Sequence, residues 1–296
     1  MSCQLYTGSF PSQRYTLDKV NSSKAYFKYI MPTLFQRAAA CLDASDPTTK
    51  VNLTQALYQD WCDDKVDLDR DFIPQEIGEV GRPDKPTLVA PRDVGKRSMH
   101  TEEGRVTLCH ALAHIEFNAI NLALDAVYRF TDMPKQYYTD WLKVASEEAY
   151  HFTLLESYLE KRGAAYGDFD AHNGLWEMAQ LTAHDVMIRM ALVPRVLEAR
   201  GLDVTPGILR KLEQSKDEEF IAHLKIIHRD EIGHVAIGSN WFKILCEQRG
   251  LEYRVVFKQL IQDYMKGSLR GPFDEVARLQ AGFSEEEIAD LNALEI

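Results

Sequence analysis

The chain has 296 residues, 45% of them hydrophobic, which is enough material for one large domain or two modest ones. Its formal net charge of −11 argues against a surface built to neutralise nucleic-acid phosphates, although a local basic groove stays open as an alternative. Five cysteines without a CxxC pair fit a reduced compartment, and we find neither a signal peptide nor an apolar run of membrane-spanning length. We therefore expect a cytoplasmic protein with no membrane partner.

The first part of the chain is predicted to form helices followed by a long irregular connection. Apolar residues recur at helical spacing over 24–42, where Pro32 interrupts the pattern, and over 52–62. Residues 71–97 then contain four prolines and three glycines, which break regular structure. Residues 1–98 are therefore predicted to be a helical extension that ends in a Pro-rich connection.

Four long helices are predicted next. Thr101 has the features of an N-cap, and Gly201 and Gly250 are expected to end the third and fourth helices. A helical tail follows, with one helix over 253–267 and a capped one from Ser284 onward. The four predicted helices are 101–130, 134–163, 174–200 and 217–249, so that 99–250 form a four-helix domain and 251–296 a tail packed on it.

Each of these four helices carries a glutamate on its apolar stripe, where a leucine would be expected. Two of them add a histidine three residues later, and side chains at i and i+3 share one helix face, so each pair can bind a metal jointly. Four carboxylates buried without counter-charge would each cost several kcal/mol or become protonated, whereas two divalent cations balance them. The candidate metal ligands, which would also form the catalytic site, are Glu116, Glu148, His151, Glu198, Glu231 and His234.

Carboxylate and imidazole ligands suit iron or manganese better than thiolate-seeking metals, and zinc can also occupy such sites. We expect two iron ions, with manganese as an alternative at one or both positions. A single Glu-x-x-His is common by chance on solvated helix faces. Two such pairs, with a glutamate on each remaining helix and all in phase with apolar stripes, are the ligand pattern of dinuclear carboxylate bundles.

Longer stretches of the chain resemble a bacterial ferritin-like family of unknown function, the domain-of-unknown-function family four-five-five. They span about residues 90–290 and include RVTLCHALAHIEFNAINLALDAVYRF, SEEAYHFTLLESYL, ALVPRVLEARGLDVTPG and RDEIGHVAIGSNWF. That family is similar to the MiaE-type hydroxylases, which use a di-iron centre and O2 on a modified tRNA base. The resemblance implies an all-α, ferritin-like four-helix bundle with additional N- and C-terminal helices. It also implies that the six candidate ligands occupy the ligand positions of the ferritin-like di-iron carboxylate superfamily.

Two acidic neighbours of the ligands differ in their expected roles. In similar bundles, the aspartate of a D-E-x-x-H run accepts a hydrogen bond from the histidine of the other motif. Asp230 is therefore interpreted either as a hydrogen-bond partner of His151 that fixes the tautomer of its ring or as a solvated charge on the helix. Glu147 is an alternative ligand by its spacing from His151, but its neighbours favour a wet helix face.

Two further residues bear on the geometry of the predicted site. Pro194 lies four residues before Glu198 and is expected to bend or widen the third helix near the metals. His228 lies one turn before Glu231 and is interpreted either as an extra ligand or as a helix-surface histidine.

The predicted function is O2 or peroxide activation by a di-iron oxidoreductase of the hydroxylase or oxygenase type. The substrate would be a small organic molecule, with a modified nucleoside as one candidate, and an external electron donor is required. A homodimer is compatible with the sequence. Two other interpretations stay open, an iron-handling ferroxidase or peroxide-scavenging protein and a metal-free structural bundle. The long extensions favour the enzyme, because iron-handling proteins usually have a compact bundle.

Overall fold

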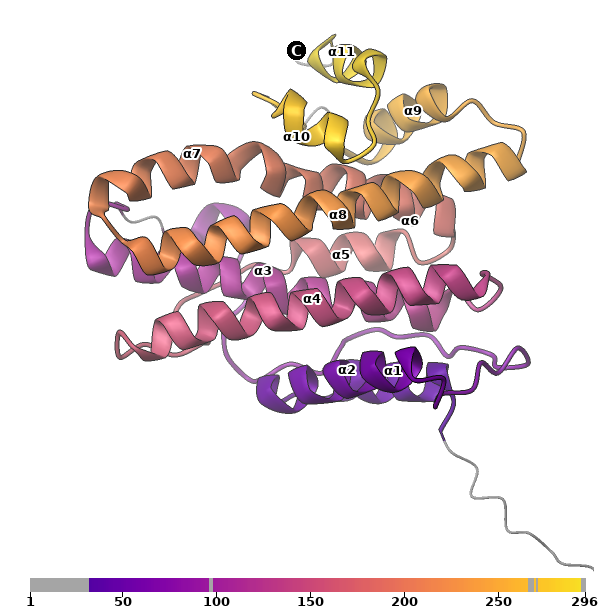
Figure 1. The fold of residues 1–296 in the computed structure, drawn as a ribbon, viewed down its shortest axis with the longest axis horizontal. Helices are drawn as coiled ribbons and strands as arrows, with labels where there is room; N and C mark the ends of the chain where they lie inside the picture. Colours follow the sequence, from indigo (N-terminus) through magenta and orange to yellow (C-terminus); the bar gives the residue numbers. More distant parts are fainter. Residues whose placement is uncertain (1–31, 96–97, 266–268, 270, 294–296) are drawn as a thin grey trace, which may run out of the picture. The chain divides into compact units, whose positions relative to one another are not determined.

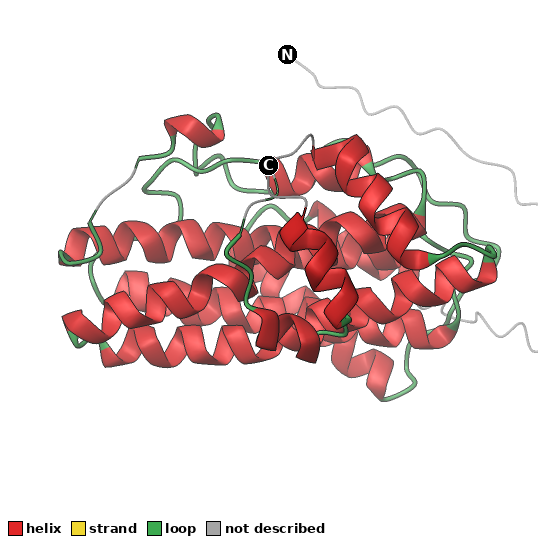
Figure 2. Ribbon diagram, turned by 90° about the horizontal axis from the view of Figure 1, so that it is seen from above, coloured by secondary structure: helices red, strands yellow, loops and turns green. Residues whose placement is uncertain are grey.

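Helices make up the regular structure of this chain. The computed structural model describes residues 32–95, 98–265, 269 and 271–293 (Figure 1). Figure 2 shows helices and loops but no strand within these ranges, so the all-α prediction is confirmed. None of the helices described has both the length and the apolar character that crossing a bilayer requires.

The N-terminal helices begin after Pro32, where the first predicted pattern was interrupted. α1 spans Leu34–Asp43 and α2 spans Pro47–Cys62. α2 begins before its predicted start because the Asp46 carboxylate accepts a hydrogen bond from the Thr49 backbone N–H at 2.8 Å, which caps the helix. Residues 24–31 of the predicted first helix lie outside the described residues.

The next two helices follow the sequence prediction closely. The Pro-rich connection is irregular over its described residues apart from the short 3-10 turn η1 (Pro91–Asp93). α3 (Glu102–Arg129) is capped by the Thr101 hydroxyl, which accepts a hydrogen bond from the Gly104 N–H at 3.1 Å. α4 (Lys135–Glu160) comes next in the chain and packs along α3.

The predicted third helix begins at Gly174 as expected, but the prediction of one continuous helix is wrong. The chain forms α5 (Gly174–Leu181), breaks, and resumes as α6 (Val186–Leu192). The break occurs because the Asp185 carboxylate accepts hydrogen bonds from the backbone N–H groups of Met187 and Ile188, at 2.7 and 3.3 Å, and so caps a new helix start.

The predicted third helix is also wrong at its end. Helical structure continues from α6 into the π-helical segment η2 (Val193–Glu198) and then into α7 (Ala199–Ser215). Gly201 does not end it, since a glycine inside a helix costs only about 1 kcal/mol and packing of α7 on α8 outweighs this cost. Pro206 also lies within α7, which ends at Lys216 in a left-handed conformation with φ of 55°.

The C-terminal part agrees with prediction except for one additional helix. Gly250, with φ of 65°, follows the end of α8, and the Ser284 hydroxyl accepts a hydrogen bond from the Glu287 N–H at 3.2 Å and caps α11. The short helix α10 was not predicted. The bounds are Glu218–Gln248 for α8, Tyr253–Met265 for α9, Glu275–Gln280 for α10 and Glu285–Ala293 for α11.

The helices that carry the candidate ligands lie between two outer groups (Figure 1). α3 pairs with α4, and α8 packs against α4, α6, η2 and α7. α1 and α2 cover α3 and α4 on one side. On the other side, α9 contacts α6 and α8, α10 contacts α7 and α8, and α11 packs on α9 and α10.

A buried lysine joins the N-terminal helices to α3. The Lys50 ammonium donates to the backbone carbonyls of Cys41 and Leu42, at 2.8 and 2.9 Å, and to Asn121 Oδ1 at 2.7 Å. All three N–H donors are therefore used, and two of them satisfy carbonyls at the C-terminal end of α1. Burial lowers the pKa of Lys50 to about 7. This contact fixes α1 and α2 beside the helix that supplies Glu116.

A proline widens the helix before Glu198, in agreement with the sequence prediction. Pro194 lies in η2, where the wider π-helical turn accommodates a residue that lacks an N–H donor. Its ring packs on α8 at Gly238, where an added Cβ would lie 2.2 Å from Pro194 Cγ. The absence of a side chain at Gly238 therefore lets η2 approach α8.

Gly238→Ala is expected to lower the free energy of unfolding by about 1–3 kcal/mol, because the new methyl group must displace Pro194. Gly233→Ala in the same helix is the control, since an added Cβ there meets no atom within 4 Å. This control should leave stability unchanged or raise it by up to about 1 kcal/mol. Urea unfolding measures both effects, and equal stability of the two variants would contradict the close packing.

Candidate metal centre

Four helical segments supply the six candidate ligands. α3 supplies Glu116, and η2 supplies Glu198 at its last residue. α4 supplies Glu148 and His151, and α8 supplies Glu231 and His234, each pair one helical turn apart. The buried members are Glu116, Glu148, His151 and His234, whereas Glu198 and Glu231 are half-buried.

One half of the cluster centres on His151. Its Nδ1 lies 3.3 Å from Glu116 Oε2 and 3.4 Å from Glu148 Oε2. Glu116, Glu148, His151 and Glu231 each offer one ligand atom, and these atoms all lie within 4.8 Å of one another. This spacing allows the four side chains to share one cation.

The other half centres on His234. Its Nδ1 lies 2.9 Å from Glu148 Oε1 and 3.5 Å from Glu231 Oε1. The two imidazole rings are 5.8 Å apart between centroids. Because one oxygen of Glu148 faces His151 and the other faces His234, this carboxylate has the arrangement of a bridge between two cations.

The electrostatics of the cluster reflect several carboxylates in a small buried volume. Burial and the charge of Glu148 raise the pKa of Glu116 to about 8. Burial and the charges of Glu231 and Glu148 raise the pKa of Glu198 well above its usual value. Burial by itself would lower the pKa of His151, but its hydrogen bonds to Glu116 and Glu148 raise it to about 11. At neutral pH the cluster therefore holds protons that cations could replace.

Two carboxylate oxygens of the cluster are buried without a hydrogen-bond partner. They are Glu198 Oε2 and Glu231 Oε2, whereas Glu148 Oε1 and His234 Nδ1 face each other at 2.9 Å. A buried polar atom without a partner costs about 1–3 kcal/mol, so two of them in one cluster are unfavourable for the protein alone. The donor set fits divalent cations, which would bind the free lone pairs of these two carboxylates.

Two outer carboxylates hold the far sides of the imidazole rings. His151 Nε2 lies 3.2 Å from Asp230 Oδ2, as one of the two interpretations of Asp230 requires, and His234 Nε2 lies 2.9 Å from Glu147 Oε2. The arrangement is reciprocal, since each acid precedes the glutamate of one motif and contacts the histidine of the other. Such contacts leave Nδ1 free to face a cation.

The interpretation of Glu147 as a residue of a wet helix face is wrong. Its side chain is 29% exposed and contacts both His234 and Lys143. Burial by itself would raise the pKa of Glu147, but the hydrogen bonds from these two residues bring it below its usual value. The signal in the sequence was the parallel between the pairs Glu147-Glu148 and Asp230-Glu231. His228 is half-buried and does not belong to the group whose ligand atoms converge.

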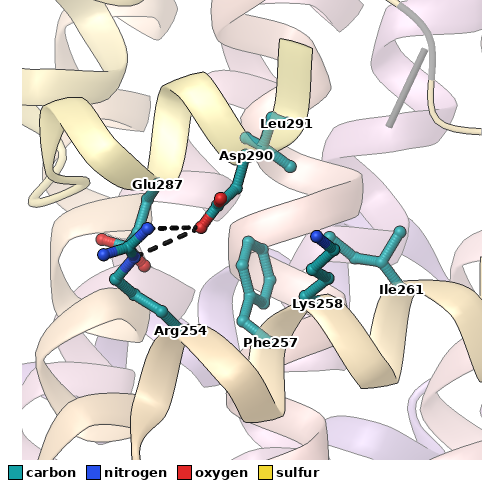
Figure 3. A pocket seen from close by; sticks show the side chains of 7 residues that line it. All are labelled: Arg254, Phe257, Lys258, Ile261, Glu287, Asp290 and Leu291. Atoms are coloured by element: carbon teal, nitrogen blue, oxygen red, sulfur yellow. Dashed lines mark hydrogen bonds and ion pairs between the residues drawn. The ribbon is translucent and has the colours of Figure 1, made fainter. Parts of the chain in front are cut away.

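The cavity in Figure 3 is separate from the candidate ligands. It lies between α9 and α11, where Arg254 and Asp290 form an ion pair at 2.9 Å, and its volume of about 10 Å³ suits a single water. A larger groove of about 200 Å³ is lined by residues that include His114, Ile115 and Leu175. Neither space is lined by a candidate ligand, so neither identifies a substrate site at the cluster.

A family model described as "Protein of unknown function (DUF455)" matches residues 43–289. The chain belongs to the DUF455 family. A relative from Haemophilus influenzae, named "Uncharacterized protein", is 45% identical to this DUF455 chain over 270 residues, covering 88% of the chain and 93% of the relative. No solved structure matches the chain. The family resemblance drawn from the sequence is thus confirmed at the level of DUF455, whose description names neither a fold nor an activity.

Glu147→Gln and Asp230→Asn are each expected to weaken binding of divalent metal to this DUF455 protein by about 10–100-fold, because each frees one imidazole to turn. Asp140→Asn is the control, since Asp140 also links α4 to α8 but accepts from Trp241 Nε1 at 2.9 Å and touches neither histidine. Equilibrium dialysis with Mn(II) measures the affinities. Wild-type affinity in both test variants would contradict the role of the outer carboxylates.

Metal binding is expected to release protons, because Glu116, with a pKa of about 8, and the protonated His151 must each lose one to become ligands. Affinity therefore rises with pH, by about tenfold per pH unit for each proton released. Calorimetric titration with Mn(II) between about pH 6 and pH 8, in buffers of different ionisation enthalpy, counts the protons. An affinity that stays constant over this range would show that the carboxylates are already free.

Proposed function

We propose that this DUF455 protein is a ferritin-like di-iron oxidoreductase that uses O2 or peroxide to hydroxylate or oxidise a small organic substrate. The observation that carries the proposal is the convergence of Glu116, Glu148, Glu231 and His151 within 4.8 Å, with His234 2.9 Å from Glu148. Four helical segments that supply two glutamates and two Glu-x-x-His pairs are the pattern of the dinuclear ferritin-like bundles.

The residues divide naturally between two cations. Glu116 and His151 would hold one iron, and Glu198 and His234 would hold the other. Glu148 and Glu231 each lie near both imidazoles, so the two cations would share these carboxylates. Oxygen and imidazole donors suit iron and also manganese, which remains an alternative at either position.

When bound, an iron pair supplies the redox chemistry with O2 or peroxide that amino-acid side chains lack. The chain itself positions the metal ligands and excludes water from the cluster. Asp230 and Glu147 orient the two imidazoles from behind, and the buried positions of Glu116 and Glu148 keep the cluster dry. Hydroxylation by O2 places one oxygen atom in the substrate and reduces the other to water, so two electrons and two protons must come from an external donor.

A modified nucleoside is the first substrate class to test, because DUF455 resembles the MiaE-type hydroxylases. This is an argument from kinship, and fold kinship alone does not fix a substrate. The net charge of −11 gives no support for tight binding of a whole tRNA through its phosphates. A free nucleoside or another small molecule is therefore preferred to an intact nucleic acid.

The test is anaerobic loading of the purified protein with Fe(II), followed by exposure to O2. We expect about two irons per chain and a bridged diferric absorption band, since both half-sites are built from iron-type ligands. Glu198→Ala should lose the band and about one iron, because the second half-site loses a ligand. Glu213→Ala, at an exposed position of α7, is the control. Wild-type protein that binds no iron, or a band that survives Glu198→Ala, would contradict the proposal.

A further inference from the structure

The C-terminal helices meet the segment that carries Glu198 through two buried ion pairs. Arg195 in η2 pairs with Glu287 in α11, and Asp203 in α7 pairs with Arg278 in α10 at 2.8 Å. No side chain of these four is more than 1% exposed. Arg195 precedes Glu198 by three residues and Asp203 follows it by five, so the two pairs flank the candidate ligand along the chain.

The Arg195 guanidinium lies among three aromatic rings. Its central carbon lies 4.8 Å from the ring centroid of Phe242, 4.1 Å from that of Phe257 and 4.5 Å from that of Phe283. Figure 3 shows Phe257 on α9 and Glu287 on α11 facing the same space. The cation is held by three aromatic faces and one carboxylate, which fixes η2 with respect to the C-terminal helices.

Asp203 is held just as firmly on the other side of Glu198. Its carboxylate accepts hydrogen bonds from Nε and Nη2 of Arg278, at 2.9 and 2.8 Å, and from the backbone N–H of Asp274 at 2.9 Å. The Arg278 guanidinium lies 4.7 Å from the ring centroid of Phe273. This bidentate ion pair fixes α7 against the start of α10.

The energetics of such pairs favour a geometric role over a purely stabilising one. A buried ion pair usually contributes no more to stability than well-packed apolar residues of the same size. It does impose direction, because a guanidinium and a carboxylate bind in few orientations. The segment from Arg195 to Glu198 is π-helical, which is rare and carries about one residue more per turn than an α-helix would, and the chain from Ala199 to Asp203 is α-helical. A return to α-helical spacing would rotate Glu198 away from Glu231 and His234.

We propose that Arg195, Glu287, Asp203 and Arg278 are positioning residues that hold η2 in its π-helical register and thereby aim Glu198 at the second half-site. The C-terminal helices are then part of the metal centre's framework. This inference rests on the proposed function, since it assigns Glu198 to a metal.

The test replaces one pair by apolar residues in the full chain, as Arg195→Met with Glu287→Leu. We expect a thermal midpoint within about 4 °C of wild type, because apolar side chains of similar size fill the same space. Mn(II) alone is the probe. Wild type should bind two ions per chain, and the variant should bind its second ion at least about tenfold more weakly. The magnetic coupling between two Mn(II) ions in the electron paramagnetic resonance spectrum should be lost with it.

The matched control is Asp125→Leu with Arg189→Met. This pair is equally buried, at 2.6 Å, but joins α3 to α6, and Asp125 also binds Arg129 on α3. It should keep two tightly bound, coupled ions. A stability change alone would appear in both double variants, whereas a positioning role appears only in the first.

Two tight, coupled Mn(II) ions in the Arg195 and Glu287 double variant would overturn this inference and leave the proposed function standing. Wild-type protein that binds no Mn(II) and no iron would instead remove the proposed function. Should the double variant not fold, Glu287→Gln decides, because it keeps the shape and removes the charge. Weaker binding of the second ion then supports the inference, and two unchanged sites contradict it.

Discussion

The gathering of carboxylates around two buried imidazoles between helices, with Glu116 and Glu148 themselves buried, is the constraint on which the rest of the structure depends. Glu148 stands at its centre, with one oxygen 3.4 Å from His151 and the other 2.9 Å from His234. Without cations, protons must neutralise this charge, and the pKa of Glu116 rises to about 8 for that reason. Apolar side chains would fill the same space at lower cost. The sequence keeps the acids, which is understandable if their purpose is to hold metal.

The helices that carry the ligands are held from both sides. Lys50 satisfies carbonyls at the end of α1 and reaches Asn121 on α3, so the N-terminal helices brace the helix of Glu116. Arg195 and Asp203 bind the C-terminal helices on either side of Glu198. Binding geometry at a metal needs ligands fixed to within about half an ångström, and a framework of buried polar contacts supplies such rigidity.

The spacing of residues predicted the cluster well because it depends on local helix geometry. Glu-x-x-His pairs and apolar stripes are properties of one helix at a time. Of the six candidates, Glu116, Glu148, His151 and Glu231 converge, and His234 lies beside Glu148. The register of the third helix depends on distant contacts instead. Gly238 on α8 leaves space for Pro194, and the packing of α7 on α8 lets the helix continue past Gly201. A local sequence pattern reveals neither contact. Glu147 was misjudged for the same reason, since its partner His234 lies on another helix.

The most direct test of a dinuclear metal centre is a crystal structure of the full chain grown anaerobically with ferrous iron, with anomalous scattering measured at the iron edge. Our account predicts two anomalous peaks, one beside His151 and one beside His234, with a carboxylate oxygen of Glu148 bound to each. An absence of anomalous density at this position, with both imidazoles still hydrogen-bonded to the surrounding carboxylates, would contradict it.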